Sequence, residues 1–129
     1  MKKIDKTAAP VLNGTRYPEP YDQPCRARSR IRLGDAAGLE QFGVNLCRLP
    51  PGAWSSQRHW HTEEDEFVYV VEGELVLVTD EGEETLRAGD CAGFKAGRGR
   101  WPPFPEQVRV GCPDPGGGQQ ARRGCRALS

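Results

Sequence analysis

His59 and His61 are the residues of this 129-residue chain whose types and spacing point most directly to chemistry. Side chains at positions i and i+2 of a β-strand lie on the same face, so two imidazoles in this arrangement can ligate one metal ion. Glu66 follows at the start of a strongly apolar segment and adds a carboxylate. Two histidines and a carboxylate form the facial set of non-haem Fe(II) sites, and zinc, manganese and nickel accept similar ligands. The pattern therefore predicts a divalent metal ion (Fe, Mn, Zn or Ni) bound by these three residues.

The same residues also have a simpler interpretation. These are the only two histidines in the chain, so they can be an isolated surface pair, and the acidic run over 63–66 can be a solvated turn. Aromatic residues nearby could line a pocket, although aromatic residues in strands more often belong to a core. They are Trp54, Trp60, Tyr69 and Phe94.

The segments that must position these residues have the composition of β-strands. Residues 66–72 and 74–79 are dense in β-branched and aromatic residues and are joined through Gly73. Weaker patterns predict further strands over 29–33, 41–49, 83–86 and 91–94. Short strands separated by turn-forming residues indicate an antiparallel sandwich or barrel, and no stretch has the period of a long helix.

Five spaced positions resemble the first motif of the cupin superfamily: Gly52, His59, His61, Glu66 and Gly73. One residue more than usual separates the first glycine from the first histidine. Residues 89–97 are similar to the second motif, with Lys95 where proline is usual. The resemblance covers about residues 28–97. It implies an all-β fold, an antiparallel cupin-type β-barrel (jelly-roll-like), with His59, His61 and Glu66 pointing inward onto a metal ion.

The second motif of that family should end with a histidine and, after three further residues, an asparagine. Those places hold Arg100 and Phe104. An arginine stays cationic and has no lone pair to donate to a metal ion, so the fourth ligand is missing. The strands that should close the barrel are not recognisable either. We therefore expect a barrel that is incomplete at its C-terminus.

Residues 98–129 differ in composition from the residues before them. Six arginines oppose two acidic residues, a net charge of +4, whereas residues 1–97 carry a net charge of −4. Glycine and proline fill eleven of these 32 positions, which predicts disorder. Codons for Trp101–Gln107 read one base later can encode Gly-His-His-Phe-Pro-Asn, if adenine is the third base of the first two proline codons and of the glutamate codon. Two hypotheses follow: a frameshifted cupin C-terminus, or a genuine disordered and divergent tail.

The chain thus divides into three expected parts. Residues 1–27 form an extended arm, because their many prolines do not suit a sheet or a helix. Residues 28–97 form the cupin-like barrel core, and residues 98–129 form the disordered or frameshifted tail. The arm either crosses the interface of a homodimer or is a flexible lead-in without contacts.

Composition also restricts location and partners. The formal net charge is zero, which argues against a nucleic-acid binder. No stretch is apolar enough to span a membrane, and the charged N-terminus lacks a signal sequence, so we expect a cytoplasmic protein. Five cysteines without a C-x-x-C pair fit neither a disulfide scaffold nor a structural zinc site. Cys47 and Cys91 are expected to be small buried apolar residues.

The predicted function is metal-dependent chemistry on a small molecule, of the dioxygenase or isomerase type. No nucleophile or general base is recognisable beyond the metal ligands, so catalysis has no independent support. Two alternatives stay open: a non-catalytic module that binds or senses a small molecule, and a frameshifted product with an impaired metal site. In each case the expected partner is a small-molecule ligand or substrate.

Overall fold

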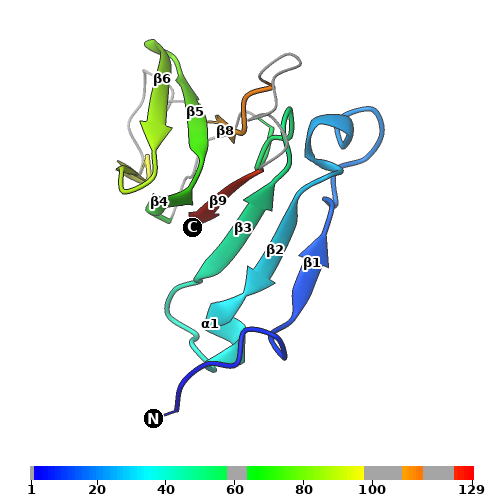
Figure 1. Cartoon of the computed structure of the whole chain (residues 1–129), viewed down its shortest axis with the longest axis vertical. Helices are drawn as coiled ribbons and strands as arrows, with labels where there is room; N and C mark the ends of the chain where they lie inside the picture. The colour runs from blue at the N-terminus through cyan, green and yellow to red at the C-terminus, as the bar shows by residue number, and fades with distance from the viewer. Residues whose placement is uncertain (1, 58–63, 98–108, 115–123) are drawn as a thin grey trace.

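The computed structural model describes residues 2–57, 64–97, 109–114 and 124–129 (Figure 1). Short strands dominate it, and its two helical elements are single turns. In chain order the elements are β1 (Val11–Asn13), the 3₁₀ turn η1 (Gln23–Cys25), β2 (Ser29–Arg32), α1 (Leu33–Ala36), β3 (Asn45–Leu49), β4 (Glu66–Glu72), β5 (Glu74–Thr79), β6 (Gly82–Arg87), β7 (Cys91–Phe94), β8 (Arg109–Gly111) and β9 (Cys125–Leu128).

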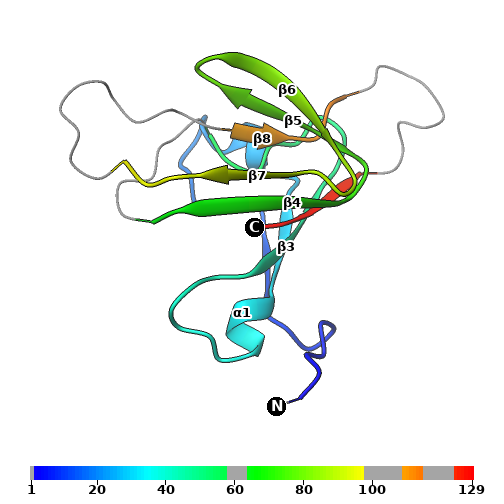
Figure 2. The ribbon, with the colours of Figure 1, turned by 90° about the vertical axis from the view of Figure 1, so that its left-hand side faces the viewer.

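The described strands form two antiparallel sheets. The larger sheet has the order β1-β2-β3-β9-β4-β7, and the smaller has the order β6-β5-β8. The small sheet lies beside β4 and β7, whereas β1 and β2 extend away from it (Figures 1 and 2). Within the described part of the chain, the edge strand β7 of the large sheet does not pair with the edge strand β8 of the small sheet. The predicted antiparallel all-β fold, with an incomplete barrel, is confirmed.

Gly73 is the point at which the chain passes from the large sheet to the small one. It joins β4 to β5 with φ +83°, a left-handed conformation that glycine adopts at low cost. A Cβ atom at this position would lie 3.2 Å from both the Cα and the Sγ of Cys125. The glycine is therefore required both by the turn and by the close approach of β9.

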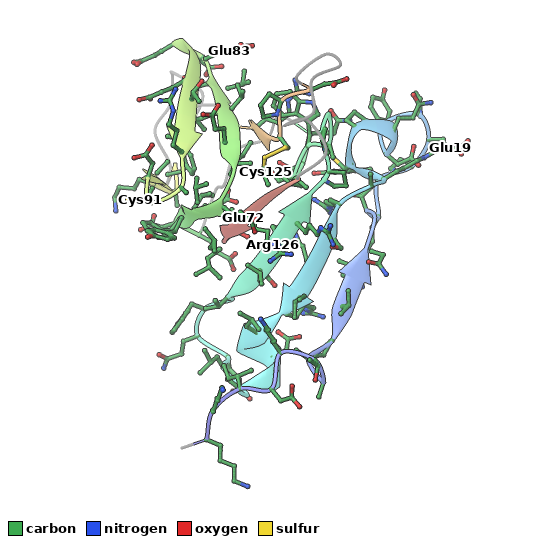
Figure 3. The ribbon with its side chains drawn as sticks, in the orientation of Figure 1. Glu19, Glu72, Glu83, Cys91, Cys125 and Arg126 are labelled. Atoms are coloured by element: carbon green, nitrogen blue, oxygen red, sulfur yellow. A yellow bond between two sulfur atoms is a disulfide. The ribbon has the colours of Figure 1, made fainter. Side chains whose placement is uncertain are left out.

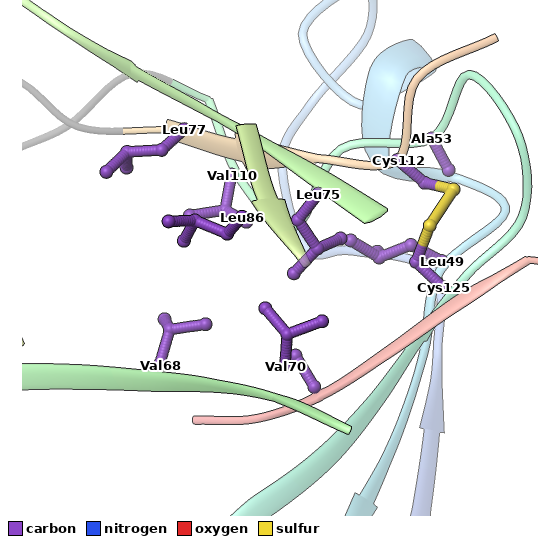
Figure 4. Close-up of a cluster of buried hydrophobic side chains, with 11 residues drawn as sticks. Leu49, Ala53, Val68, Val70, Leu75, Leu77, Leu86, Val110, Cys112 and Cys125 are labelled. Atoms are coloured by element: carbon purple, nitrogen blue, oxygen red, sulfur yellow. A yellow bond between two sulfur atoms is a disulfide. The ribbon is translucent and has the colours of Figure 1, made fainter. Parts of the chain in front are cut away.

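The space between the sheets holds the apolar core (Figure 4). Val70 and Leu75 are fully buried, and they come from the two strands that Gly73 connects. The cluster comprises Leu49, Ala53, Val68, Val70, Leu75, Leu77, Leu86, Val110, Cys112, Cys125 and Ala127. Burial of this apolar surface is the main force that holds one sheet against the other.

The described parts of the C-terminal segment belong to this core, which differs from the disorder expected for residues 98–129. Strand β8 pairs with β5, and β9 lies between β3 and β4 in the large sheet. Val110 and Ala127 are buried. Each strand needs only a few residues, because its backbone pairs with strands already present. Low overall apolar content is therefore compatible with order at 109–114 and 124–129.

The N-terminal arm is also more regular than its proline content predicts. Residues Val11–Asn13 form the edge strand β1, which pairs with β2. Cys25 in η1 is fully buried, and the backbone N–H of Trp54 donates to the carbonyl of Pro24. The prolines flank the strand instead of interrupting it. The alternative of a lead-in without contacts is therefore wrong for these residues.

Two of the five cysteines form a disulfide, which the sequence did not indicate. Cys112 and Cys125 are bonded, with their Cα atoms 5.8 Å apart, and link the segment after β8 to the start of β9. Cys47 is buried, as predicted. Cys91 is exposed, contrary to prediction, because it faces Tyr69 on the outer side of the large sheet. The disulfide ties the two sheets together at their C-terminal strands.

Candidate metal centre

Of the three predicted metal ligands, the described part of the chain contains Glu66. His59 and His61 lie outside the described residues, so the structure does not test whether the three side chains meet. Among the described residues there is no group of three or more histidine, cysteine, aspartate and glutamate side chains with metal-binding geometry. The predicted site is therefore judged from the surroundings of Glu66.

Glu66 shares one face of β4 with core residues. It is the first residue of the strand, and Val68 and Val70 follow at the same parity and are buried. Alternate residues of a strand point to the same side of the sheet. Glu66 itself is only partly buried. The carboxylate thus belongs to the inner face of the sheet, at the end of the core where solvent still reaches it.

Phe94 lies opposite Glu66 on the neighbouring strand β7. It is half-buried and packs against the apolar core, together with Ala92. The Glu66 carboxylate thus has an apolar neighbour on one side and is partly exposed on the other. Such a setting suits a metal ligand at a site that a small molecule must enter. Phe94 is therefore consistent with the predicted role in lining a pocket.

Asp65 connects the start of β4 to the segment that follows β7. Its Oδ1 accepts a hydrogen bond from the backbone N–H of Ala96 at 2.8 Å, and its Oδ2 lies 3.7 Å from the Nζ of Lys95. These contacts hold the residue before Glu66 against the second of the two recognised motifs. Lys95 occupies the place where a proline is usual, and its ammonium group supplies a contact that a proline cannot.

Two other aromatic residues were expected near the pocket. The guanidinium carbon of Arg109 lies 3.7 Å from the centroid of the Trp54 ring, a cation–π contact, and Gly111 packs against the same ring. Tyr69 is 40% exposed and points outward, so the expectation that it lines the pocket is wrong. It alternates with Val68 and Val70 along β4, which explains its outward direction. Trp60 lies outside the described residues.

A second candidate site, which the sequence analysis missed, is a basic groove of about 580 Å³. Four arginines line it, Arg16, Arg28, Arg30 and Arg32, together with apolar side chains that include Leu12 and Tyr17. None of its lining residues is acidic. The signal was visible as the alternation Arg-x-Arg-x-Arg over 28–32, but the sequence did not show which face of the sheet stays open. Glu66 does not line this groove.

Of the described residues, none lies in a helix with the length and apolar character needed to cross a membrane.

Comparison with known proteins gives one family and several structures of similar fold. The family model described as "Cupin domain" matches residues 45–110. The chain is 42% identical to a protein from Silicibacter pomeroyi described as a sugar phosphate isomerase from a cupin superfamily. The TM-score is 0.83, and the match covers 98% of this chain and 73% of that one. No curated protein shows significant similarity in sequence.

Two more distant structures share the fold. A putative sugar phosphate isomerase from Acidithiobacillus ferrooxidans is 23% identical, with a TM-score of 0.68, over 91% of this chain and 65% of that one. A predicted oxalate decarboxylase from Thermotoga maritima is 15% identical, with a TM-score of 0.66, over 98% of this chain and 95% of that one. At these identities the likeness concerns the fold alone.

Proposed function

Because the chain belongs to the cupin superfamily, we propose that it binds a divalent metal ion through His59, His61 and Glu66 and isomerises a small phosphorylated sugar. The observation that carries the proposal is the position of Glu66 on the inner face of β4, beside the buried Val68 and Val70. The resemblance expects the metal-binding glutamate on the inner face, so this position supports the proposal. The isomerase type is supported by the protein that is 42% identical over nearly the whole chain.

The chemical character of these three residues fits a divalent ion. Two imidazoles and one carboxylate leave coordination positions open for a substrate. A metal ion bound there would act as a Lewis acid that polarises a carbonyl or hydroxyl group of the sugar. Glu66 would hold the ion from the sheet, and Phe94 would shield one side of the site from water. Asp65, through Ala96, would keep the two motifs in register.

An aldose–ketose interconversion assay on a panel of sugar phosphates tests the activity. We expect turnover in the metal-loaded protein, and loss of turnover after chelation or in Glu66→Gln. Glu83→Gln is the matched control, because Glu83 is an exposed residue of β6 in the small sheet (Figure 3). Saturable ligand binding without turnover in the wild type would favour the alternative, a non-catalytic binding or sensing module. Absence of both would contradict each of these functions.

We also propose that the chain forms a homodimer through the outer face of the large sheet. One apolar row crosses every strand of that sheet through successive register partners. Its members are Val11, Ile31, Leu46, Leu128, Tyr69 and Cys91. Val11 is 54% exposed and Phe67, next to the row on β4, is 57% exposed. The other apolar members of the row, Ile31, Leu46 and Leu128, are partly exposed. A contiguous apolar surface that solvent reaches is typical of interfaces. Sedimentation of wild type and Phe67→Ser tests the proposal, and a monomeric wild type would contradict it.

The frameshift hypothesis for residues from about 98 onward stays a prediction. Arg100 and Phe104, which stand in place of the expected histidine and asparagine, lie outside the described residues. The pairing of β9 with β3 and β4 supports an ordered C-terminus, and so it favours the chain as written. The nucleotide sequence across codons 95–110 tests the hypothesis. If the shifted frame lacks the histidine and asparagine codons, the hypothesis is wrong.

A further inference from the structure

The basic groove lies on the inner face of the large sheet. Arg30 pairs in register with Cys47 on one side and with Leu12 on the other. Cys47 in turn pairs with Ala127, a core residue, so Arg30 and the core share one face of the sheet. Strands β1 and β2 extend beyond the small sheet (Figure 1). The same face is thus apolar where the second sheet covers it and basic where β1 and β2 continue past it.

Alternation along β2 explains why the arginines gather there. Arg28, Arg30 and Arg32 occupy every second position, so their side chains point to the same side. Arg16 lies in the segment between β1 and η1 and lines the same groove. Like charges brought together in this way repel one another, and the arrangement is unfavourable unless something negative balances it.

The described residues do not balance the charge of Arg28 and Arg30. The Arg28 side chain is buried, with 7% of the residue exposed, and its Nε donates to the carbonyl of Gly14 at 2.8 Å. Arg30 donates to the Sγ of Cys47 at 3.2 Å and to the carbonyl of Ser55 at 3.3 Å. None of these acceptors is a carboxylate, and no carboxylate of the described residues pairs with either guanidinium. Within the described part of the chain, both cations are therefore held in place without a carboxylate partner.

Arg32 and Arg16 complete the groove in different ways. Arg32 is paired with Asp35 at 2.8 Å, so part of its charge is already balanced. Arg16 is exposed and makes no ion pair within the described residues. Burial, and next the charge of Arg30, lower the pKa of Arg28, which shows that this cation is held in an unfavourable environment. A negative ligand in the groove would relieve that cost.

We propose that the groove binds the phosphate group of a small phosphorylated molecule. The planar guanidinium group matches phosphate through paired hydrogen bonds, and Arg28 and Arg30 are preorganised to donate them. A volume of about 580 Å³ exceeds the need of a bare phosphate and falls in the range of small-molecule sites. Leu12 and Tyr17 would contact the uncharged part of the ligand. The inference does not rest on the metal site, because no residue of β4 lines the groove.

Calorimetric titration of the full chain with glucose 6-phosphate, inorganic phosphate and glucose tests the proposal. We expect saturable binding of the two phosphates and none of glucose, with the sugar phosphate tighter because it also contacts Leu12 and Tyr17. Arg16→Gln should weaken binding of both about tenfold, since one charge-assisted hydrogen bond is lost. This variant should fold normally, because the Arg16 side chain is exposed. Arg30→Gln should weaken binding at least as much.

Arg48→Gln is the matched control, because Arg48 is exposed on β3 and points to the opposite face from Cys47. Its affinity should equal that of the wild type. Arg16→Gln should keep the metal content of the wild type, which separates this proposal from that of the metal site. Equal affinities in wild type, Arg16→Gln and Arg30→Gln would overturn the proposal. So would binding of a short single-stranded RNA without any binding of the phosphates, because the groove would then serve a polyanion.

Discussion

Asp65 accepts a hydrogen bond from the backbone N–H of Ala96, 2.8 Å from its Oδ1, across a separation of 31 residues. This contact joins the two segments that carry the sequence motifs of the fold. Asp65 directly precedes Glu66, so it fixes the entry of the chain into β4. The position of the candidate metal ligand thus depends on a contact made by its neighbour.

Replacing Asp65 separates this positioning role from the charge. Asp65→Ala removes the acceptor and should lower the free energy of unfolding by about 1 kcal/mol, and it should weaken metal binding. Asp65→Asn keeps an oxygen that can accept from Ala96, so it should lose less of both. Denaturant unfolding and metal titration of the two variants measure this difference. Equal loss in both variants would mean that the charge near Lys95 matters and the hydrogen bond does not.

The disulfide between Cys112 and Cys125 should stabilise the protein. It closes a loop over a sequence separation of 13 residues, for which loop entropy gives about 3 kcal/mol. Urea unfolding with and without a reductant measures the effect. The exposed Cys91 supplies the control, because Cys91→Ser should leave the unfolding free energy of the oxidised protein unchanged. An unchanged midpoint after complete reduction would show that the bond does not constrain the fold.

Gly111 should not tolerate a side chain. A Cβ atom there would lie 2.4 Å from the Trp54 ring, too close for a normal contact. Gly111→Ala should therefore displace the ring and destabilise the protein by about 2 kcal/mol. Gly43→Ala is the matched control, since its nearest neighbour to an added Cβ is a side-chain atom at 3.9 Å. Thermal unfolding of both variants decides the matter, and equal melting temperatures would contradict the packing.

Strand β9 should be essential to the fold. It lies between β3 and β4, so its removal breaks the large sheet in two and uncovers Leu49 and Val70. A chain that ends at residue 123 should lose its cooperative unfolding transition. Removal of residues 2–8, which precede β1, is the control and should leave the transition in place. A shortened chain that melts like the full one would mean that β9 is dispensable.

The sequence predicted the central strands well and the peripheral ones poorly. The bounds of β4 and β5 agree with the prediction at both ends, because each is a run of β-branched residues that ends at Gly73 or at a polar turn. By contrast, β1 and β9 lie in segments rich in glycine and proline. They are strands because β2, β3 and β4 offer backbone partners, and such long-range pairing leaves little trace in local composition.

Predictions about the site were limited in a similar way. The inward direction of Glu66 was implied by the resemblance, and in the structure Glu66 has the same parity on β4 as the buried Val68 and Val70. The same alternation shows that Tyr69 points outward. The disulfide could not be foreseen, because the spacing of cysteines says nothing about which of them meet in space. The arginines of β2 alternate visibly in the sequence. Only the sheet order shows that their face continues from the core into solvent.

The metal content of the purified protein tests the central claim most directly. We expect about one equivalent of divalent metal in the wild type and in Glu83→Gln. His59→Ala, His61→Ala and Glu66→Gln should each lose most of it, because each removes one of three ligands. Elemental analysis after identical purification provides the measurement. Equal metal content in the wild type and in all three ligand variants would contradict the assignment of these residues as a metal site.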